Sequence, residues 1–278
     1  MDEAIAVLGR YQGEARVLAG GQSLVPMMNF RLATPAAIVD LNRILGLAKI
    51  EIVDGVVTIG AMARQRQLEF APSVAEKLPL LSEALRWVGH LPTRSRGTIG
   101  GSIAHADPAA EIPMVLQALA GEVVVRGPQG ERRIAAPDLI LAPLTTALNP
   151  DEILTEVRFP VMPSGAVHAI EEFARRKGDF AIAAIAVMLV RDGEHCTTAR
   201  LATAGIGPVP VRLRDAEAIL EERGLGEEAV AAAAQRAAEL VEPMADHNAS
   251  ADFRCHLTAV LTRRAILKAR DRENVRTD

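Results

Sequence analysis

The spacing of hydrophobic residues changes part-way along this 278-residue chain. Up to Phe159, short alternating or β-branched runs separated by Gly, Pro and Asp predict strands with helices between them. A group of residues that break helices and strands follows: Pro160, Pro163, Ser164 and Gly165. After this group, strand-like runs come first and helical runs second, which predicts an α+β architecture with helices on one face of a sheet.

Before Phe159 the pattern predicts a mixture of short elements. The expected helices span residues 2–9, 74–89 and 109–119, and the expected strands span 15–19, 35–41, 49–53, 56–59, 122–126, 132–135 and 152–159. Leu78, Leu81 and Leu85 recur at three- and four-residue spacing, which favours one continuous helix over 74–89. Asp54-Gly55 is a strong hairpin signal between two of the strands.

After Gly165 the pattern predicts a smaller unit. The expected strands span residues 169–175, 182–190 and 197–204, and the expected helices span 211–223, 227–240 and 251–270. The last two strands are joined around Asp192-Gly193. The breaker group at 160–165 is therefore the best candidate for a domain boundary.

Two stretches combine a glycine pair with polar side chains. Ala19-Gly20-Gly21-Gln22-Ser23 follows a strand-like run, and Thr98-Ile99-Gly100-Gly101-Ser102 precedes the apolar segment at 109–119. Glycines let successive backbone N–H groups point outward, and such groups ahead of a helix form a site for phosphate or pyrophosphate. Ser23 is expected to cap the helix that follows it. For either pair alone, a plain tight turn is an alternative interpretation.

Composition excludes several classes of function. Aromatic residues make up 3% and the formal net charge is −4 with no concentrated basic block, which argues against nucleic-acid binding. The longest apolar run, Phe180 to Val190, is too short to span a bilayer. The acidic start lacks the features of a secretory signal, so a cytoplasmic location is expected. Cys196 and Cys255 are the only cysteines and cannot hold an iron–sulfur cluster with four thiolates.

Several segments, in order along nearly the whole chain, resemble one known family. They are Ala19–Ile44 (AGGQSLVPMMNFRLATPAAIVDLNRI), Arg96–Pro113 (RGTIGGSIAHADPAAEIP), Thr145–Pro160, Arg175–Ala183 and Gly205–Arg212. The chain resembles the FAD-binding medium subunit of the molybdenum hydroxylases, the family of carbon monoxide dehydrogenase and xanthine dehydrogenase. The resemblance implies an FAD-binding domain over 1–163, made of subdomains of about 1–50 and 51–163 with the flavin between them. A C-terminal α+β domain over 166–278 would contain a three-stranded antiparallel sheet and helices.

The resemblance also implies which residues contact FAD. The two glycine stretches would hold the pyrophosphate and the adjoining parts of FAD. Glu111 would contact the sugar-alcohol part of FAD, and Leu154 would line the flavin. Lys177 and Phe180 would lie near the isoalloxazine ring. An alternative interpretation of Glu111 is an acidic residue placed in the first turn of a helix because the helix dipole favours it there. An alternative interpretation of Lys177 is a cation on a solvated surface. The expected cofactor-binding residues are Leu18, Ala19, Gly20, Gly21, Gln22, Ser23, Thr98, Ile99, Gly100, Gly101, Ser102, Glu111, Leu154, Lys177 and Phe180.

No residue of this chain is expected to act as a catalytic acid, base or nucleophile, or as a metal ligand. His105 could shuttle protons, but no triad partner lies at a suitable spacing and a structural role is favoured. The other histidines are scattered without metal-ligand intervals.

The resemblance implies a role in electron transfer. Electrons from a molybdenum-cofactor large subunit would pass through [2Fe–2S] clusters on a small subunit to FAD in this chain, and then to an external acceptor. The complex would be a dimer of heterotrimers. One alternative is a self-contained FAD-dependent oxidoreductase, which would need its own substrate pocket. Another is a redox-inactive nucleotide-binding scaffold, although the glycines of both stretches are present.

Overall fold

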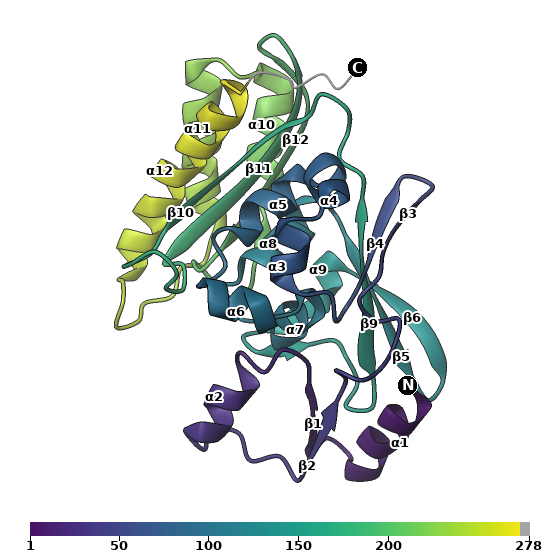
Figure 1. The fold of residues 1–278 in the computed structure, drawn as a ribbon. Helices are drawn as coiled ribbons and strands as arrows, with labels where there is room; N and C mark the ends of the chain where they lie inside the picture. The colour runs from purple at the N-terminus through teal and green to yellow at the C-terminus, as the bar shows by residue number, and fades with distance from the viewer. Residues whose placement is uncertain (273–278) are drawn as a thin grey trace.

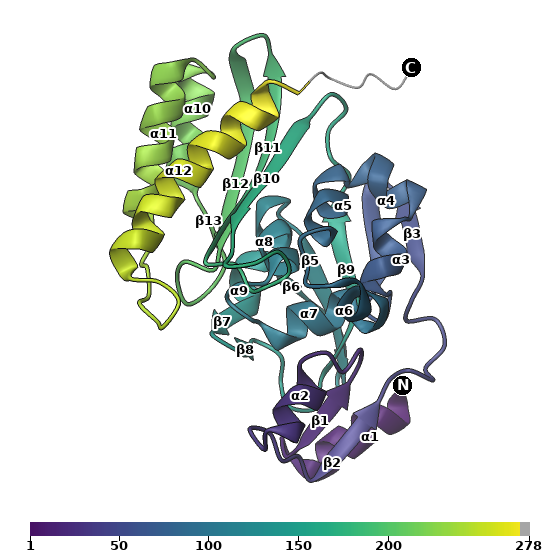
Figure 2. The same cartoon turned by 60° about the vertical axis from the view of Figure 1, so that its left-hand side comes forward.

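The computed structural model describes residues 1–272 of the chain. Two sheets with a layer of helices between them form most of the structure, and further helices cover the outer face of one sheet (Figures 1 and 2). The predicted α+β architecture is confirmed. Residues 273–278, the end of the predicted C-terminal domain, lie outside the described residues.

The first sheet has five antiparallel strands in the order β3-β4-β9-β5-β6. These strands are β3 (Ile50–Val53), β4 (Val56–Gly60), β5 (Glu122–Gly127), β6 (Gly130–Ala135) and β9 (Ile153–Pro160). The predicted hairpin around Asp54-Gly55 is confirmed, because β3 pairs with β4 there, and the predicted strands at 122–126 and 132–135 pair as a second hairpin, β5 with β6. The long strand β9 lies in the centre and returns between the two hairpins (Figure 1).

A small N-terminal segment lies at the end of this sheet. It consists of α1 (Asp2–Tyr11), β1 (Ala15–Leu18), α2 (Leu24–Asn29) and β2 (Ala37–Asp40). Strands β1 and β2 are parallel, and α2 lies in the connection between them. Ile5, Leu8 and Val39 belong to a small core of this segment, which also includes Ile153 of β9. By contrast, α2 has no buried residue.

The middle helices differ most from the sequence-based prediction. They are α3 (Gln65–Glu69), α4 (Pro72–Lys77), α5 (Pro79–Leu85), α6 (Leu91–Arg96), α7 (Ile99–His105), α8 (Glu111–Ala118) and α9 (Ala136–Leu139), followed by the short hairpin β7 (Ile140–Ala142) and β8 (Thr145–Thr146). The single helix predicted over 74–89 is wrong. The chain breaks at Leu78 and begins α5 at Pro79, because proline has no N–H to continue a helix but fits a first turn.

The second sheet has the order β10-β11-β12-β13 and is antiparallel throughout. Its strands are β10 (Val167–Phe173), β11 (Ala183–Asp192), β12 (His195–Ala204) and β13 (Val211–Arg212), and the helices α10 (Arg214–Arg223), α11 (Glu227–Leu240) and α12 (Ala251–Arg270) follow. The three predicted strands are confirmed. However, the predicted helix 211–223 is wrong at its start, because residues 211–212 form the fourth strand and pair with β12.

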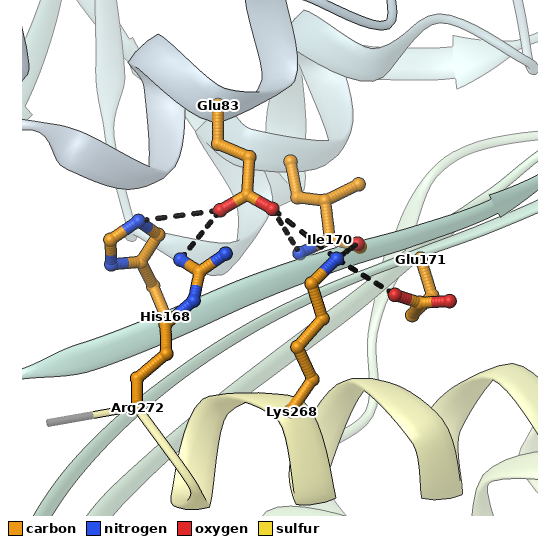
Figure 3. Close-up of polar contacts among 6 residues, drawn as sticks. All are labelled: Glu83, His168, Ile170, Glu171, Lys268 and Arg272. Atoms are coloured by element: carbon orange, nitrogen blue, oxygen red, sulfur yellow. Dashed lines mark hydrogen bonds and ion pairs between the residues drawn. The ribbon is translucent and has the colours of Figure 1, made fainter.

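The two faces of the second sheet have different neighbours. Odd-numbered residues of β11, such as Ile185 and Val187, belong to a core shared with α10, α11 and α12. Even-numbered residues, such as Ala184 and Ala186, belong to the core of the middle helices and first sheet. The contact between the second sheet and the middle helices also has a polar part at β10, where His168 lies beside Glu83 of α5 (Figure 3). A continuous core therefore joins the parts on either side of residues 163–166, and the domain boundary there stays a prediction.

Within residues 1–272, no helix is both long and apolar enough to cross a bilayer.

Candidate cofactor-binding site

A cavity of about 710 Å³ lies where the N-terminal segment, the middle helices and the second half of the chain meet. It is lined by the β1–α2 loop, by α7 and the start of α8, by the start of β9, and by residues 178–180 before β11. The β1–α2 loop, the start of β9 and residues 178–180 belong to or adjoin three different sheets, so segments far apart in the sequence meet at this cavity.

The β1–α2 loop presents unpaired backbone donors along one side of the cavity. Within the described residues, the N–H groups of Gly20, Gly21, Gln22 and Ser23 donate no hydrogen bond. Gly21 has a φ of +72°, a conformation that glycine adopts without strain. Gln22 Nε2 donates to the Gly20 carbonyl over 3.0 Å and braces the turn. A row of free N–H groups in such a turn is suited to bind phosphate oxygens.

Gly20 also permits a close approach between two loops. A Cβ atom at Gly20 would lie 2.8 Å from the Gly97 Cα and would overlap the Arg96 carbonyl oxygen. The β1–α2 loop therefore packs directly on the backbone of the α6–α7 turn, which carries the second glycine stretch.

The second glycine stretch is not a loop ahead of a helix, as predicted, but the first turn of α7. Ile99 N–H donates to the Ala63 carbonyl over 3.1 Å, and Gly100 N–H donates to the Ala61 carbonyl over 2.9 Å. Gly101 N–H donates to the Thr98 side-chain oxygen. A Cβ at Gly100 would lie 2.8 Å from the Ala61 Cα. These N–H groups are thus already used, and the glycines allow close packing of α7 on the segment after β4.

Thr98 caps its helix, whereas Ser23, the predicted cap, does not. Thr98 Oγ1 accepts the Gly101 N–H bond at 3.0 Å, whereas the Ser23 side chain makes no cap bond to α2. The predicted capping by Ser23 is therefore wrong. Thr98→Ala is expected to destabilise the FAD-free chain by about 1 kcal/mol, and Ser23→Ala by less than about 0.5 kcal/mol. Urea unfolding of both variants measures the difference. Equal losses would contradict the assignment of Thr98 as the cap.

Comparison with known proteins identifies the family. Residues 1–162 match the model for the FAD binding domain in molybdopterin dehydrogenase, and residues 168–269 match the CO dehydrogenase flavoprotein C-terminal domain. The chain belongs to the FAD-binding medium subunits of the molybdenum hydroxylases.

Individual relatives match over nearly their full length. The 6-hydroxypseudooxynicotine dehydrogenase complex subunit alpha of Paenarthrobacter nicotinovorans is 39% identical, over 97% of this chain and 91% of its own. The carbon monoxide dehydrogenase medium chain of Hydrogenophaga pseudoflava is 36% identical, over 95% and 92%. Among solved structures, reconstituted CO dehydrogenase from Oligotropha carboxidovorans superposes with a TM-score of 0.95 at 36% identity, covering 98% of this chain and 95% of that chain.

The cofactor of this medium subunit is FAD, and the residues present fit it. The free N–H groups of Gly20 to Ser23 suit the pyrophosphate, which is anionic and accepts hydrogen bonds. Gln65 of α3 lines the same cavity, and its buried Oε1 has no partner within the described residues. A buried amide normally finds a partner, so a hydroxyl or N–H group of the cofactor would complete its hydrogen bonding.

The structure brings most of the predicted site residues together. Ala19 to Ser23, Thr98, Gly100 to Ser102, Glu111, Leu154 and Phe180 all line the cavity. Three do not: Leu18 precedes the loop in β1, Ile99 is fully buried, and Lys177 lines a different cavity with Glu83 and Trp87. The roles of individual residues toward FAD stay predictions.

The segment between β10 and β11 explains why Lys177 and the residues that follow it line different cavities. Gly178 has a φ of +91° and packs against the His90 ring, where a Cβ would lie 2.5 Å from Nδ1. The backbone turns at this point, so that Gly178 to Phe180 face the cofactor cavity while Lys177 faces the other one. Phe180 is 72% exposed at the rim, which is unusual for a large aromatic side chain.

Glu111 is the most unusual charged group of the cavity. It occupies the first turn of α8, is only 8% exposed, and has a pKa raised to about 7. Burial is the main cause, and repulsion by Asp107 adds to it, while the Glu111 backbone N–H and Arg94 act in the opposite direction. Near neutral pH, Glu111 is therefore close to the midpoint of its titration.

Other lining residues were missed because they lie on elements that the pattern did not reveal. Gln65 and Thr93 lie on α3 and α6. His105, for which a structural role was predicted, ends α7 and also lines the cavity. Asp107 accepts the Ala109 N–H bond over 2.9 Å and forms the turn between α7 and α8. Only the Asp107-Pro108 dipeptide, a typical turn signal, could have indicated that position.

Proposed function

We propose that this chain carries electrons within a molybdenum hydroxylase complex. It would receive them from the [2Fe–2S] clusters of a small subunit, which are in turn supplied by a molybdenum-cofactor large subunit. FAD, when bound, supplies the redox chemistry, accepting electrons and passing them in pairs to an external acceptor. The observation that carries the proposal is the FAD-suited cavity in a chain whose two halves match the FAD binding domain in molybdopterin dehydrogenase and the CO dehydrogenase flavoprotein C-terminal domain.

The residues of the chain would bind and orient the cofactor. The N–H groups of the β1–α2 loop would hold the pyrophosphate, and α7 would form the wall against which the cofactor lies. Leu154, which is 5% exposed, would exclude water from one side of the flavin. Phe180 at the rim would cover the ring from the second half of the chain. None of these roles needs a residue of this chain to exchange a proton with an organic substrate.

The assembly as a dimer of heterotrimers and a cytoplasmic location are also proposals. The names of the relatives support a multi-subunit complex, because several are described as medium or alpha subunits of dehydrogenase complexes. Analytical ultracentrifugation of the purified complex and fractionation of the source cells would test the two points separately.

The first experiment is to purify the tagged chain from its own cells and record its visible spectrum together with the co-purifying chains. We expect flavin absorption overlaid by iron–sulfur absorption, with one larger and one smaller companion. A single flavin-containing chain that turns over a substrate unaided would favour the self-contained oxidoreductase. A colourless complex that does not take up FAD would favour the scaffold.

A further inference from the structure

Residues 61–65, which follow β4, run beside the start of α7. Ile99 N–H donates to the Ala63 carbonyl over 3.1 Å. Arg64, the next residue, forms an isolated antiparallel bridge with Thr98. The backbone of Arg64 is therefore fixed relative to the second glycine stretch.

The Arg64 side chain binds two acceptors at once. Its Nη1 donates to the Arg96 carbonyl in the turn before α7, and its Nη2 donates to Asn42 Oδ1 over 2.6 Å. A guanidinium group carries its N–H donors in a rigid plane, so it holds two acceptors at a set spacing. Arg64 does not line the cofactor cavity, and it would act on the cofactor through these two partners.

Asn42 completes the connection to the β1–α2 loop. Asp40, the last residue of β2, accepts the Asn42 N–H over 2.9 Å and the Asn42 Nδ2 over 2.6 Å. Asn42 Nδ2 also donates to the Ala19 carbonyl over 3.0 Å. The C=O and N–H of a planar trans peptide point in opposite directions. Holding the Ala19 carbonyl therefore also sets the direction of the Gly20 N–H, one of the free donors of the loop.

These hydrogen bonds form a bridge from Arg96 through Arg64 and Asn42 to Ala19, the Asn42–Arg64 bridge. It joins the same two backbones that meet at Gly20, where an added Cβ would overlap the Arg96 carbonyl oxygen. The contact at Gly20 prevents the two backbones from moving closer together. The bridge opposes their separation, so the two contacts together fix the distance between the loop and α7.

We propose that Asn42 and Arg64 are positioning residues for FAD, because their bridge holds the β1–α2 loop at the distance from α7 that the pyrophosphate requires. Neither residue lines the cavity, and the hydrogen bonds of the bridge lie at the surface. Substitutions at the surface change the stability of a fold little, so the main effect of breaking the bridge falls on cofactor affinity. The inference rests on the proposed binding of the pyrophosphate by this loop.

The test compares the full-length wild-type chain with Asn42→Ala, Arg64→Met and the double variant. We expect each single substitution to raise the FAD dissociation constant, from flavin fluorescence, about tenfold, the factor for one lost hydrogen bond to a charged group. The double variant should also lose about tenfold, because either substitution breaks the same bridge, whereas two independent residues would lose about 100-fold. The urea midpoint of the FAD-free chain should stay close to the wild-type value in all three variants. A general loosening of the fold would lower that midpoint instead.

Arg43→Met is the matched control for charge. Arg43 is exposed and lies next to Asn42, but it takes no part in the bridge. Arg43→Met removes the same charge as Arg64→Met and should keep the wild-type affinity for FAD. Equal losses in these two variants would mean that charge, rather than the bridge, sets the affinity, and would overturn the proposal.

Wild-type affinity in Asn42→Ala, or a loss of about 100-fold in the double variant, would also overturn it. Asn42→Ala changes no charge, so it decides alone if Arg64→Met does not fold. Gly20→Ala separates the bridge from the site on which it acts. If Gly20→Ala weakens FAD binding and the bridge variants do not, only the bridge fails. If none of these variants changes the affinity, the proposed role of the β1–α2 loop fails as well.

Discussion

Gly20→Ala is expected to weaken FAD binding strongly while most of the chain stays folded. The added methyl group would overlap the Arg96 carbonyl oxygen and lie 2.8 Å from the Gly97 Cα, and backbone cannot rotate away as a flexible side chain can. The β1–α2 loop must therefore shift, and its row of free N–H groups moves relative to α7. We expect FAD affinity to fall about 100-fold or more, which corresponds to roughly 3 kcal/mol. Flavin fluorescence titration measures the loss.

Gly9→Ala is the matched control for this variant. Gly9 lies in α1, and an added Cβ there would have nothing within 4 Å. Alanine in a helix is more favourable than glycine by about 0.5–1 kcal/mol. Gly9→Ala should bind FAD as the wild type does and unfold at a slightly higher urea concentration. Wild-type FAD affinity in Gly20→Ala would show that the contact between the two loops is not needed for binding.

Arg254→Met is expected to cause the largest loss of stability in the second half of the chain. Arg254 of α12 is 6% exposed, and its Nη1 donates to the Ile182 carbonyl over 2.6 Å and to the Gly205 carbonyl. Its Nη2 pairs with Asp246 over 2.8 Å. Methionine fills similar volume but leaves these acceptors unpaired. We expect a loss of about 3–5 kcal/mol in the free energy of unfolding, as for other broken buried pairs.

Arg263→Met tests whether the loss comes from burial. Arg263 lies on the same helix and pairs with Glu227 over 3.0 Å, but the two side chains are 51% and 73% exposed. Exposed pairs contribute about 0–1 kcal/mol. Thermal unfolding of both variants gives the comparison. Similar midpoints for the two would mean that Arg254 does not tie α12 to the ends of β11 and β12.

The contact made by Arg254 also bears on the cofactor site. Ile182 follows the segment 178–180 that lines the cavity, and Gly205 bonds to the turn before α8. Arg254 thus holds two segments that reach the cavity from the second half of the chain. Arg254→Met is therefore expected to weaken FAD binding as well, although none of its atoms line the cavity.

Local sequence signals correctly indicated most of the strands and the hairpin around Asp54-Gly55, but not the short strand β13 or the central place of β9 in its sheet. Hydrophobic alternation with turn residues between runs predicted the hairpin around Asp54-Gly55 and three strands of the second sheet, because these features depend on neighbouring residues only. The same signals failed in the middle helices. Leucine spacing continued through Leu78 and favoured one helix, but Pro79 divides it. Short helices such as α7 have too few residues for a clear period.

The sequence by itself determined the family, the cofactor and the glycines that approach it, because a glycine pair with polar neighbours is a local feature that a resemblance can match. Only the tertiary structure decided how those glycines work. Gly20 to Ser23 keep their N–H groups free, whereas Ile99 and Gly100 donate theirs to the segment after β4. It also placed Lys177 outside the cofactor cavity, in a second cavity that Glu83 and Trp87 line. The physical reason is that burial and unpaired charge depend on residues far apart in sequence, which only the packing of the sheets and helices brings together.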